Sequence, residues 1–255
     1  MRDTRIQKAM ADQGMCSRRQ AEQIILEGRV KLNGRPVQLG DKMDIKADIL
    51  SVDGERVFFD RKKEYYYYMM NKPRGYITTS KDDRGRKTVL DLISDTPARV
   101  YPIGRLDKDS EGLLLFTNDG NFANQLTHPS HQVSKLYRVT VRPTVTEEQL
   151  IALANGDYLH DCTKTLPAIV RVVTQEENRS VLEISIKEGK NRQVRRMCAA
   201  VGLEVARLRR NAIGPVKLGM LAPGKYRELK PVEINALKAA ATKAKRTQRQ
   251  AEKED

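Results

Sequence analysis

The chain has 255 residues, with 47 Lys and Arg against 33 Asp and Glu, so its net charge is +14. Hydrophobic residues make up 39% of the chain, which excludes a wholly disordered protein, and no apolar run approaches the ~18 residues that span a bilayer. The N-terminus has no apolar segment of the kind found in a signal peptide, so we expect a cytoplasmic protein with no membrane partner.

The first 60 residues predict a small domain of two helices followed by short strands. Apolar side chains at helical spacing predict a helix over residues 4–13. Ser17 is a suitable N-cap for a second helix, which we expect to end at Gly28. Residues 30–37 alternate around Asn33-Gly34, the pattern of a hairpin with a type I′ turn.

After a charged link that begins at residue 61, a second domain is expected to extend to residue 237. Its predicted strands cover residues 65–70, 113–117, 136–142 and 182–186. Its predicted helices cover residues 121–127, follow the N-cap Thr146, and start near Asn191 with Val194, Met197, Cys198 and Val201 on one apolar face. Residues 238–255 are polar and of low complexity, so we expect a frayed helix or a disordered tail.

The positive charge is concentrated in two parts of the chain. Residues 187–211 hold eight Lys and Arg against two Glu, and residues 1–35 hold eight against four acidic residues. Such an excess favours a polyanionic partner, most simply nucleic acid, which the protein would contact at two places.

Several common site motifs are absent from the sequence. It contains no GxxxxGK[ST], no GxGxxG after a strand and no GxSxG, so nucleotide hydrolysis, dinucleotide binding and a serine triad are unsupported. Cys16, Cys162 and Cys198 form no CxxC pair, which argues against a zinc ribbon or a disulfide framework. His128 and His131 lack a third ligand nearby, so a loop or helix-cap role is favoured and no metal site is expected.

One loop carries a candidate catalytic carboxylate, Asp107, two residues after Arg105. The spacing alone does not assign catalysis, because a loop aspartate is most often a turn former and Arg-x-Asp is most often a surface ion pair. Asp109 could complete a carboxylate pair of the kind that hydrolyses glycosides, but nothing in the sequence sets the separation which that chemistry requires.

Longer motifs are more specific. GRLDKDSEGLLLFTNDG, at residues 104–120, resembles the signature of the ribosomal-RNA pseudouridine synthases. YMMNKPRGYITT, KLYRVTV and the segment that begins EGKNRQVRRM resemble other motifs of this family, in the same order. Residues 1–50 resemble its small S-four-like RNA-binding domain. The resemblance covers nearly everything except the tail, and details around HPSHQVSKLY favour the branch that modifies large-subunit RNA.

The resemblance implies an α+β fold with three parts: an S-four-like domain over residues 1–60, a catalytic domain over residues 61–237 and a tail over residues 238–255. The catalytic domain is expected to have a mixed, mainly antiparallel sheet with flanking helices. Ribosomal RNA is the implied partner, free or within an assembling subunit, and we expect a monomer that needs no cofactor.

The family's roles can be carried over residue by residue. Asp107 matches the essential aspartate, Tyr137 matches the tyrosine that stacks on the target base and helps in proton removal, and Arg195 matches the basic residue paired with the aspartate. Arg105 matches an arginine near the bound RNA, and Leu182 and Ile184 are expected around the uracil. Further RNA contacts are expected from Arg192, Arg196, Arg18, Arg19 and Lys31.

These roles suit the isomerisation of uridine, which moves the ribose bond from ring nitrogen to ring carbon without oxidation or phosphate transfer. An anionic group near the sugar and base could attack covalently or stabilise charge, and an aromatic ring could hold the flipped base. Attack on the sugar, attack on the base and elimination to a glycal all stay open. The alternatives are a non-catalytic ribosome-assembly factor, or the same chemistry on small-subunit or transfer RNA.

Overall fold

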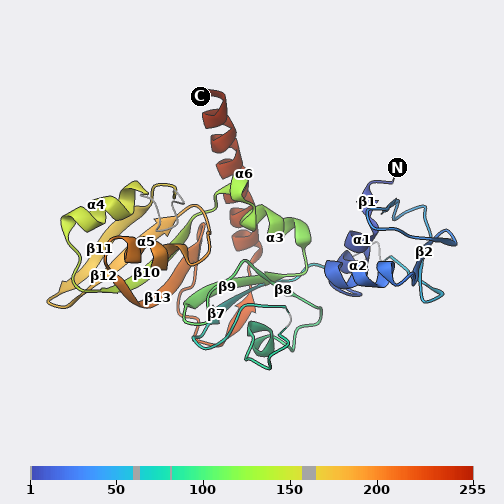
Figure 1. The fold of residues 1–255 in the computed structure, drawn as a ribbon, viewed down its shortest axis with the longest axis horizontal. Helices are drawn as coiled ribbons and strands as arrows, with labels where there is room; N and C mark the ends of the chain where they lie inside the picture. Colours follow the sequence, from blue (N-terminus) through green and yellow to red (C-terminus); the bar gives the residue numbers. More distant parts are fainter. Residues whose placement is uncertain (1, 60–63, 81, 157–164, 255) are drawn as a thin grey trace. The chain divides into compact units, whose positions relative to one another are not determined.

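The computed structural model describes residues 2–59, 64–80, 82–156 and 165–254. The chain divides into two compact units, one formed by residues 1–65 with 97–99, the other by residues 66–96 and 100–255 (Figure 1). The predicted charged link and Cys162 fall mainly or wholly outside the described residues. Within the described ranges every helix is either too short or too polar to cross a lipid bilayer.

The N-terminal unit consists of two helices and two small sheets. Its elements are β1 (Thr4–Arg5), α1 (Ile6–Asp12), α2 (Arg18–Leu26), β2 (Val30–Leu32), β3 (Arg35–Pro36), β4 (Lys42–Met43), β5 (Leu50–Val52) and β6 (Glu55–Arg56). Strands β3-β2-β5-β6 form one sheet, and β1 pairs with β4. The helices pack their apolar faces against the strands, and Ile6, Met10 and Leu50 are fully buried there.

Local signals in this unit predict the structure well. Ser17 Oγ accepts from the backbone N–H of Gln20 at 3.2 Å and the Gln20 side chain accepts from the Ser17 N–H at 2.9 Å, so the predicted N-cap is confirmed as a capping box. Asn33 and Gly34 both have positive φ, as a type I′ hairpin turn requires. The first helix is shorter than predicted because residues 4–5 pair as a strand with β4.

The second unit is built on one large sheet whose main path runs β11-β12-β10-β13-β9-β7-β15. Its strands are β7 (Tyr67–Lys72), β8 (Tyr101–Ile103), β9 (Glu111–Thr117), β10 (Lys135–Arg142), β11 (Ile169–Glu176), β12 (Arg179–Ile186), β13 (Glu204–Ile213), β14 (Val216–Lys217) and β15 (Tyr226–Glu228). Its helices are η1 (Val89–Leu92), α3 (Gly120–Thr127), η2 (Pro129–His131), α4 (Glu147–Asn155), α5 (Gln193–Ala200) and α6 (Pro231–Glu254). The predicted strands and helices of this domain are confirmed, with small shifts at their ends.

The sheet has two antiparallel halves joined by a short parallel pairing of β13 with β9, where Arg209 and Arg210 lie opposite Glu111 and Gly112. A β-carbon on Gly112 would lie 2.3 Å from the carbonyl oxygen of Arg210, and the residue has a φ of +105°. Only glycine fits so close an approach at such a φ, so the glycine of the EGLLLFT segment allows the two halves to join.

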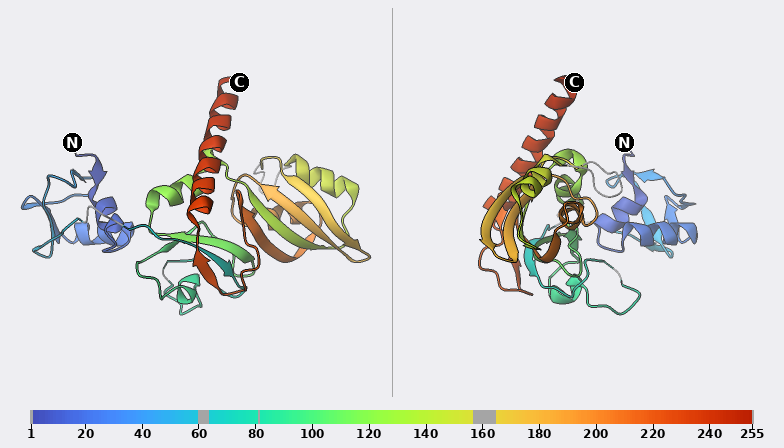
Figure 2. Two further views of the ribbon diagram at one scale, coloured as in Figure 1. Left: turned by 180° about the vertical axis from the view of Figure 1, so that it is seen from behind. Right: turned by 60° about the vertical axis from the view of Figure 1, so that its left-hand side comes forward.

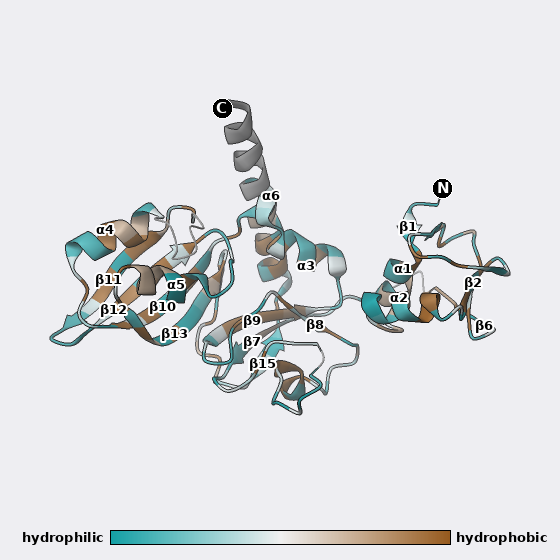
Figure 3. Cartoon of the chain, in the orientation of Figure 1, coloured by the Kyte–Doolittle hydropathy of each residue, from teal (hydrophilic) through white to brown (hydrophobic). Residues whose placement is uncertain are grey.

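Alternating residues of β9 face two separate cores. Leu114 and Phe116 face the core shared with α4, α5 and the strands of the other half, whereas Leu113 and Leu115 face the core under α3 and α6. Figure 2 shows α3 and α6 on one side of this part of the sheet, and Figure 3 shows that β9 is apolar along most of its length. The continuous apolar run of β9 therefore marks a strand covered on both faces.

The C-terminal segment is helical, which is one of the two forms expected for it. Residues 231–254 form one helix, α6, so the expected polar tail from residue 238 begins within a helix. Leu237 and Ala241 lie one turn apart and are both buried in the core under α3. This packing anchors the start of the segment, and its alanines favour continuation as a helix.

Candidate active site

The loop between β8 and β9, residues 104–110, carries the candidate aspartate and is held from beneath by Lys72. The Lys72 side chain is fully buried, and its Nζ donates to the carbonyl oxygens of Asp107 at 3.0 Å and Ser110 at 2.8 Å. A third bond, of 3.1 Å, goes to the carbonyl of Pro73. Burial lowers the pKa of Lys72 to about 8. The lysine of the NKPRG segment thus fixes the backbone of the aspartate loop.

Two further contacts hold the same loop from its side. Thr78 Oγ1 donates to the carbonyl of Leu106 at 2.8 Å, and the backbone N–H of Leu106 donates back to that hydroxyl at 3.3 Å. The N–H of Gly75 donates to the carbonyl of Lys108 at 2.8 Å. The segment that follows β7 therefore clamps the loop along most of its length.

The predicted ion pair between Arg195 and Asp107 is not formed. Arg195 donates instead to the carbonyls of Val205 at 3.1 Å and Asp109 at 3.2 Å, while the guanidinium at 3.6 Å from the Asp107 carboxylate belongs to Arg192. The reason is the start of α5: Arg192 precedes the helix in a left-handed conformation and reaches the loop, whereas Arg195 lies one turn inside the helix. Arg195 contacts the loop's backbone, and burial lowers the pKa of its guanidinium, although the charge of Asp107 opposes that shift.

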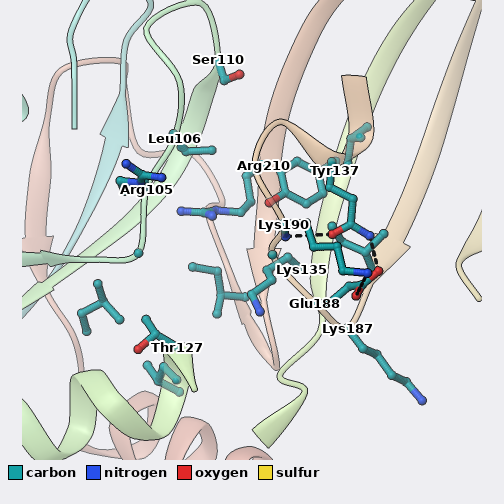
Figure 4. A pocket seen from close by; sticks show the side chains of 18 of the residues that line it. Arg105, Leu106, Ser110, Thr127, Lys135, Tyr137, Lys187, Glu188, Lys190 and Arg210 are labelled. Atoms are coloured by element: carbon teal, nitrogen blue, oxygen red, sulfur yellow. Dashed lines mark hydrogen bonds and ion pairs between the residues drawn. The ribbon is translucent and has the colours of Figure 1, made fainter. Parts of the chain in front are cut away.

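A pocket of about 340 Å³ opens beside Asp107 (Figure 4). Its walls come from the aspartate loop, from β10, from the end of β12 and from the start of α5. Tyr137 lines the pocket from β10 and is 8% exposed. The fold therefore brings Asp107 and Tyr137, thirty residues apart in sequence, to one apolar recess of a size suited to a flat ring.

Cationic side chains line the inner part of this pocket as well as its edge. Arg210 lies opposite Tyr137 on the neighbouring strand and is 4% exposed. Lys135 lines the same pocket, and burial, followed by the charge of Arg210, lowers its pKa to about 8. Glu188 lies nearby, paired with Lys190 at 3.3 Å. The pocket thus combines an apolar recess with an excess of positive charge.

The predicted RNA-contacting residues fall into two groups. In the second unit, Arg105 and Arg192 are exposed and line the pocket, whereas Arg196 is half-buried on α5 and is not among the lining residues. Arg18 and Arg19 on α2 and Lys31 on β2 are all exposed in the N-terminal unit. The exposed members of both groups can therefore be reached by a polyanion.

Two other sequence-based expectations are resolved by the structure. Leu182 and Ile184 are fully buried in the core and do not line the pocket, whereas Ile186, farther along β12, does. The part of β12 that lines the pocket therefore lies farther along the strand than the resemblance implied. His128 accepts a hydrogen bond from the N–H of Ser130 at 3.2 Å, the helix-cap role favoured for it.

Sequence reasoning missed Lys72 and Arg210 as parts of the site. Both are nearly or fully buried charged residues, but Lys72 ends the mainly apolar strand β7, whereas Arg210 lies in β13 among other charged residues and does not stand out in the sequence. A charge inside an apolar run is a usable signal, because a buried charge needs partners and is therefore rarely incidental. By contrast, Cys198 is core as expected, and burial raises the pKa of its thiol to about 12.

Comparison with known proteins agrees with this geometry. A family described as RNA pseudouridylate synthase matches residues 66–200, and the S4 domain family matches residues 4–49. A protein of Bacillus subtilis called ribosomal large subunit pseudouridine synthase B is 43% identical over 94% of this chain and 98% of its own length. An uncharacterized RNA pseudouridine synthase of Aquifex aeolicus is 44% identical over 93% and 94%.

A solved structure is also similar. A protein described as a pseudouridylate synthase aligns with a TM-score of 0.66 and 32% identity, over 92% of this chain and all of its own. The similarity therefore extends over both units and is not confined to the short motifs around the pocket.

Proposed function

The chain belongs to the RNA pseudouridylate synthase family and is an isomerase, and from this premise we propose that it converts a uridine of large-subunit ribosomal RNA to pseudouridine. The choice of RNA is supported by the Bacillus subtilis relative, whose name specifies the large ribosomal subunit. The N-terminal unit, with Arg18, Arg19 and Lys31 exposed, is proposed to capture structured RNA, in keeping with its match to the S4 domain family.

The observation that carries the proposal is the convergence of Asp107 and Tyr137 at one pocket. The bond from ribose C1′ to N1 of the base must break and a bond from C1′ to C5 must form, after which C5 loses a proton. We assign Asp107 as the group that attacks or stabilises charge beside this carbon. Tyr137 is proposed to stack on the base and to help in removing the proton.

Two arginines are proposed to support Asp107 in different ways. Arg192 forms an ion pair with the Asp107 carboxylate at 3.6 Å, and because both side chains are partly exposed, solvent screens this pair. Arg195 fixes the loop through the Asp109 carbonyl and is a positioning residue. Arg105, exposed at the rim, is proposed to contact the RNA and occupy the space that the flipped base leaves.

The experiment that tests this function maps pseudouridines across total RNA from cells with the protein, without it, and with Asp107→Asn in its place. We expect one large-subunit uridine to lose its modification in the deletion and in Asp107→Asn, while Asp109→Asn keeps it. Asparagine preserves the size of the side chain but removes its charge. An unchanged modification map would refute the proposal, and a lost site in small-subunit or transfer RNA would correct the substrate.

A further inference from the structure

Arg210 has donors that the fold does not use. Its Nε donates to the carbonyl of Leu113 on β9 at 2.7 Å, which ties the two halves of the sheet together. Its Nη2 is buried and has no hydrogen-bond partner among the residues that the structure describes. Since buried polar groups are nearly always hydrogen-bonded, the free side of this guanidinium, at a ligand pocket, indicates a ligand atom.

The orientation of the Arg210 side chain also agrees with a ligand atom at Nη2. Its Cα is paired in register with that of Tyr137, so both side chains project from the same face of the sheet. In Figure 4 the Arg210 side chain extends from beside Tyr137 toward the loop that bears Arg105 and Leu106. A ring stacked on Tyr137 would therefore lie within reach of Nη2.

The charges around Arg210 indicate which kind of ligand atom would bind to Nη2. Lys135, in the same pocket, has its pKa lowered partly by Arg210, so two cations repel each other there. The carboxylate of Glu188 already accepts from Gln193 Nε2 at 2.6 Å and from the N–H of Leu166 at 2.9 Å, and it pairs with Lys190. The inner pocket thus fits an acceptor that gains negative charge.

The depth of Arg210 distinguishes a base from a phosphate. Arg210 is 4% exposed, whereas the Arg192 side chain at the pocket edge is 47% exposed. A phosphate is strongly hydrated and suits the exposed rim, while a flipped base is planar, largely apolar at its faces and able to enter a recess.

We propose that Arg210 donates a hydrogen bond through Nη2 to a carbonyl oxygen of the flipped uracil and stabilises the charge which that oxygen gains during isomerisation. This rests on the proposed function. When the C1′–N1 bond breaks, its electron pair passes to the uracil ring and spreads onto the carbonyl oxygens. The pair returns when C5 bonds to C1′; C5 then loses its hydrogen as a proton and N1 takes up a proton, so the product is a neutral isomer of the substrate. A donor fixed in advance at the carbonyl favours the charged state.

The test couples one protein atom to one substrate atom. The substrate is a ribosomal RNA fragment containing the uridine identified by mapping, with that uridine unsubstituted, as 2-thiouridine or as 4-thiouridine. Single-turnover rates are measured at saturating RNA for wild type, Arg210→Met, Arg210→Lys and the control Arg209→Met. Arg209 is the adjacent residue of β13, so its side chain projects from the opposite face of the sheet.

We expect Arg210→Met to slow conversion roughly 100-fold with little change in RNA affinity, as for loss of one charge-stabilising donor. Arg209→Met should keep the wild-type rate. One of the two thio substitutions should slow conversion by the wild type, because sulfur is a weaker hydrogen-bond acceptor than oxygen. In Arg210→Met and Arg210→Lys, the same thio substitution should change the rate little from that of the same variant on the unsubstituted RNA. Arg210→Lys keeps the charge and provides the coupling measurement if the methionine variant does not fold.

Three outcomes would overturn the contact. Both thio substitutions could slow wild type and Arg210 variants by equal factors, or Arg210→Lys could keep the wild-type rate and thio sensitivity. If the Arg210 variants bind RNA more weakly but keep the wild-type rate at saturating RNA, Arg210 contacts a phosphate and not the base. The mapping experiment tests the proposed function beforehand and without Arg210 variants, so a failure of the function is distinguished from a failure of Arg210.

Discussion

Replacing Lys72 by methionine tests whether one buried ammonium group holds the aspartate loop. Its Nζ donates to the carbonyls of Pro73, Asp107 and Ser110. Burial lowers its pKa from 10.5 to about 8, which corresponds to roughly 3 kcal/mol against the charged form. Hydrogen bonds to a charged group contribute about 1.5–3 kcal/mol each, so the three bonds outweigh this penalty.

The expected effect is a loss of both stability and rate. Methionine fills a similar volume but leaves three carbonyl groups without their donor, so Lys72→Met should lower the free energy of unfolding by about 3–5 kcal/mol. The released loop should also shift, and a displacement of ~1 Å at the reacting group can slow turnover ~100-fold. Urea unfolding followed by circular dichroism measures the first effect, and single-turnover conversion at saturating RNA measures the second.

Lys108→Met is the matched control, because Lys108 lies on the same loop but is exposed. Its unfolding free energy should stay within about 0.5 kcal/mol of wild type. Amide exchange at Ser110, whose N–H donates to the Asp107 carbonyl at 3.1 Å, reports on the loop itself and should accelerate only in Lys72→Met. Wild-type stability, exchange and rate in Lys72→Met would refute the role given to Lys72.

Four other predictions concern separate features. Arg195→Ala should slow single turnover at saturating RNA by roughly 10–100-fold, and Arg196→Ala should weaken binding instead; a normal rate in Arg195→Ala would exclude loop positioning. Gly112→Ala should destabilise the protein by about 3 kcal/mol or more in denaturant unfolding, whereas Gly189→Ala, with nothing within 4 Å of the added carbon, should be nearly neutral. A fragment lacking the N-terminal unit should fold and bind RNA with a shallower salt dependence, the slope falling by roughly one for each lost phosphate contact; an unchanged slope would argue against RNA capture by that unit. The pKa of Lys135 is lowered to about 8 in the folded protein, so above pH 8 the folded chain has lost a proton that the unfolded chain still holds. The free energy of unfolding of wild type, relative to that of Lys135→Met, should therefore rise as pH increases above 8. A difference between the two proteins that does not change with pH would contradict the lowered pKa.

Local features of the fold could be predicted from sequence because each depends on a few adjacent residues. The N-cap at Ser17, the Asn33-Gly34 turn and the N-cap at Thr146 are all formed as expected. The end of the chain was harder, because a polar, alanine-rich segment becomes an anchored helix only when Leu237 and Ala241 find a core to enter.

The same distinction between local and long-range features applies to the site. Asp107 and Tyr137 could be selected from the sequence because each lies in a segment with a distinctive pattern, and the structure brings both to one pocket. Which arginine approaches Asp107 depends on where α5 begins and on the left-handed backbone at Arg192, neither of which a residue pattern specifies. Arg210 gains its meaning only when β13 and β10 pair in register.

The strand order of the large sheet also constrains when the site can be completed during synthesis. Strand β7 is paired with β9 on one side and, on its other side, with β15, which is formed by residues 226–228. Asp107 belongs to the half that β15 completes, while Tyr137 and Arg210 belong to the other half, whose strand β13 pairs in parallel with β9. A nascent chain therefore cannot complete the half that presents Asp107 until residues 226–228 have been synthesised, so this half is completed after β10 and β13 of the other half.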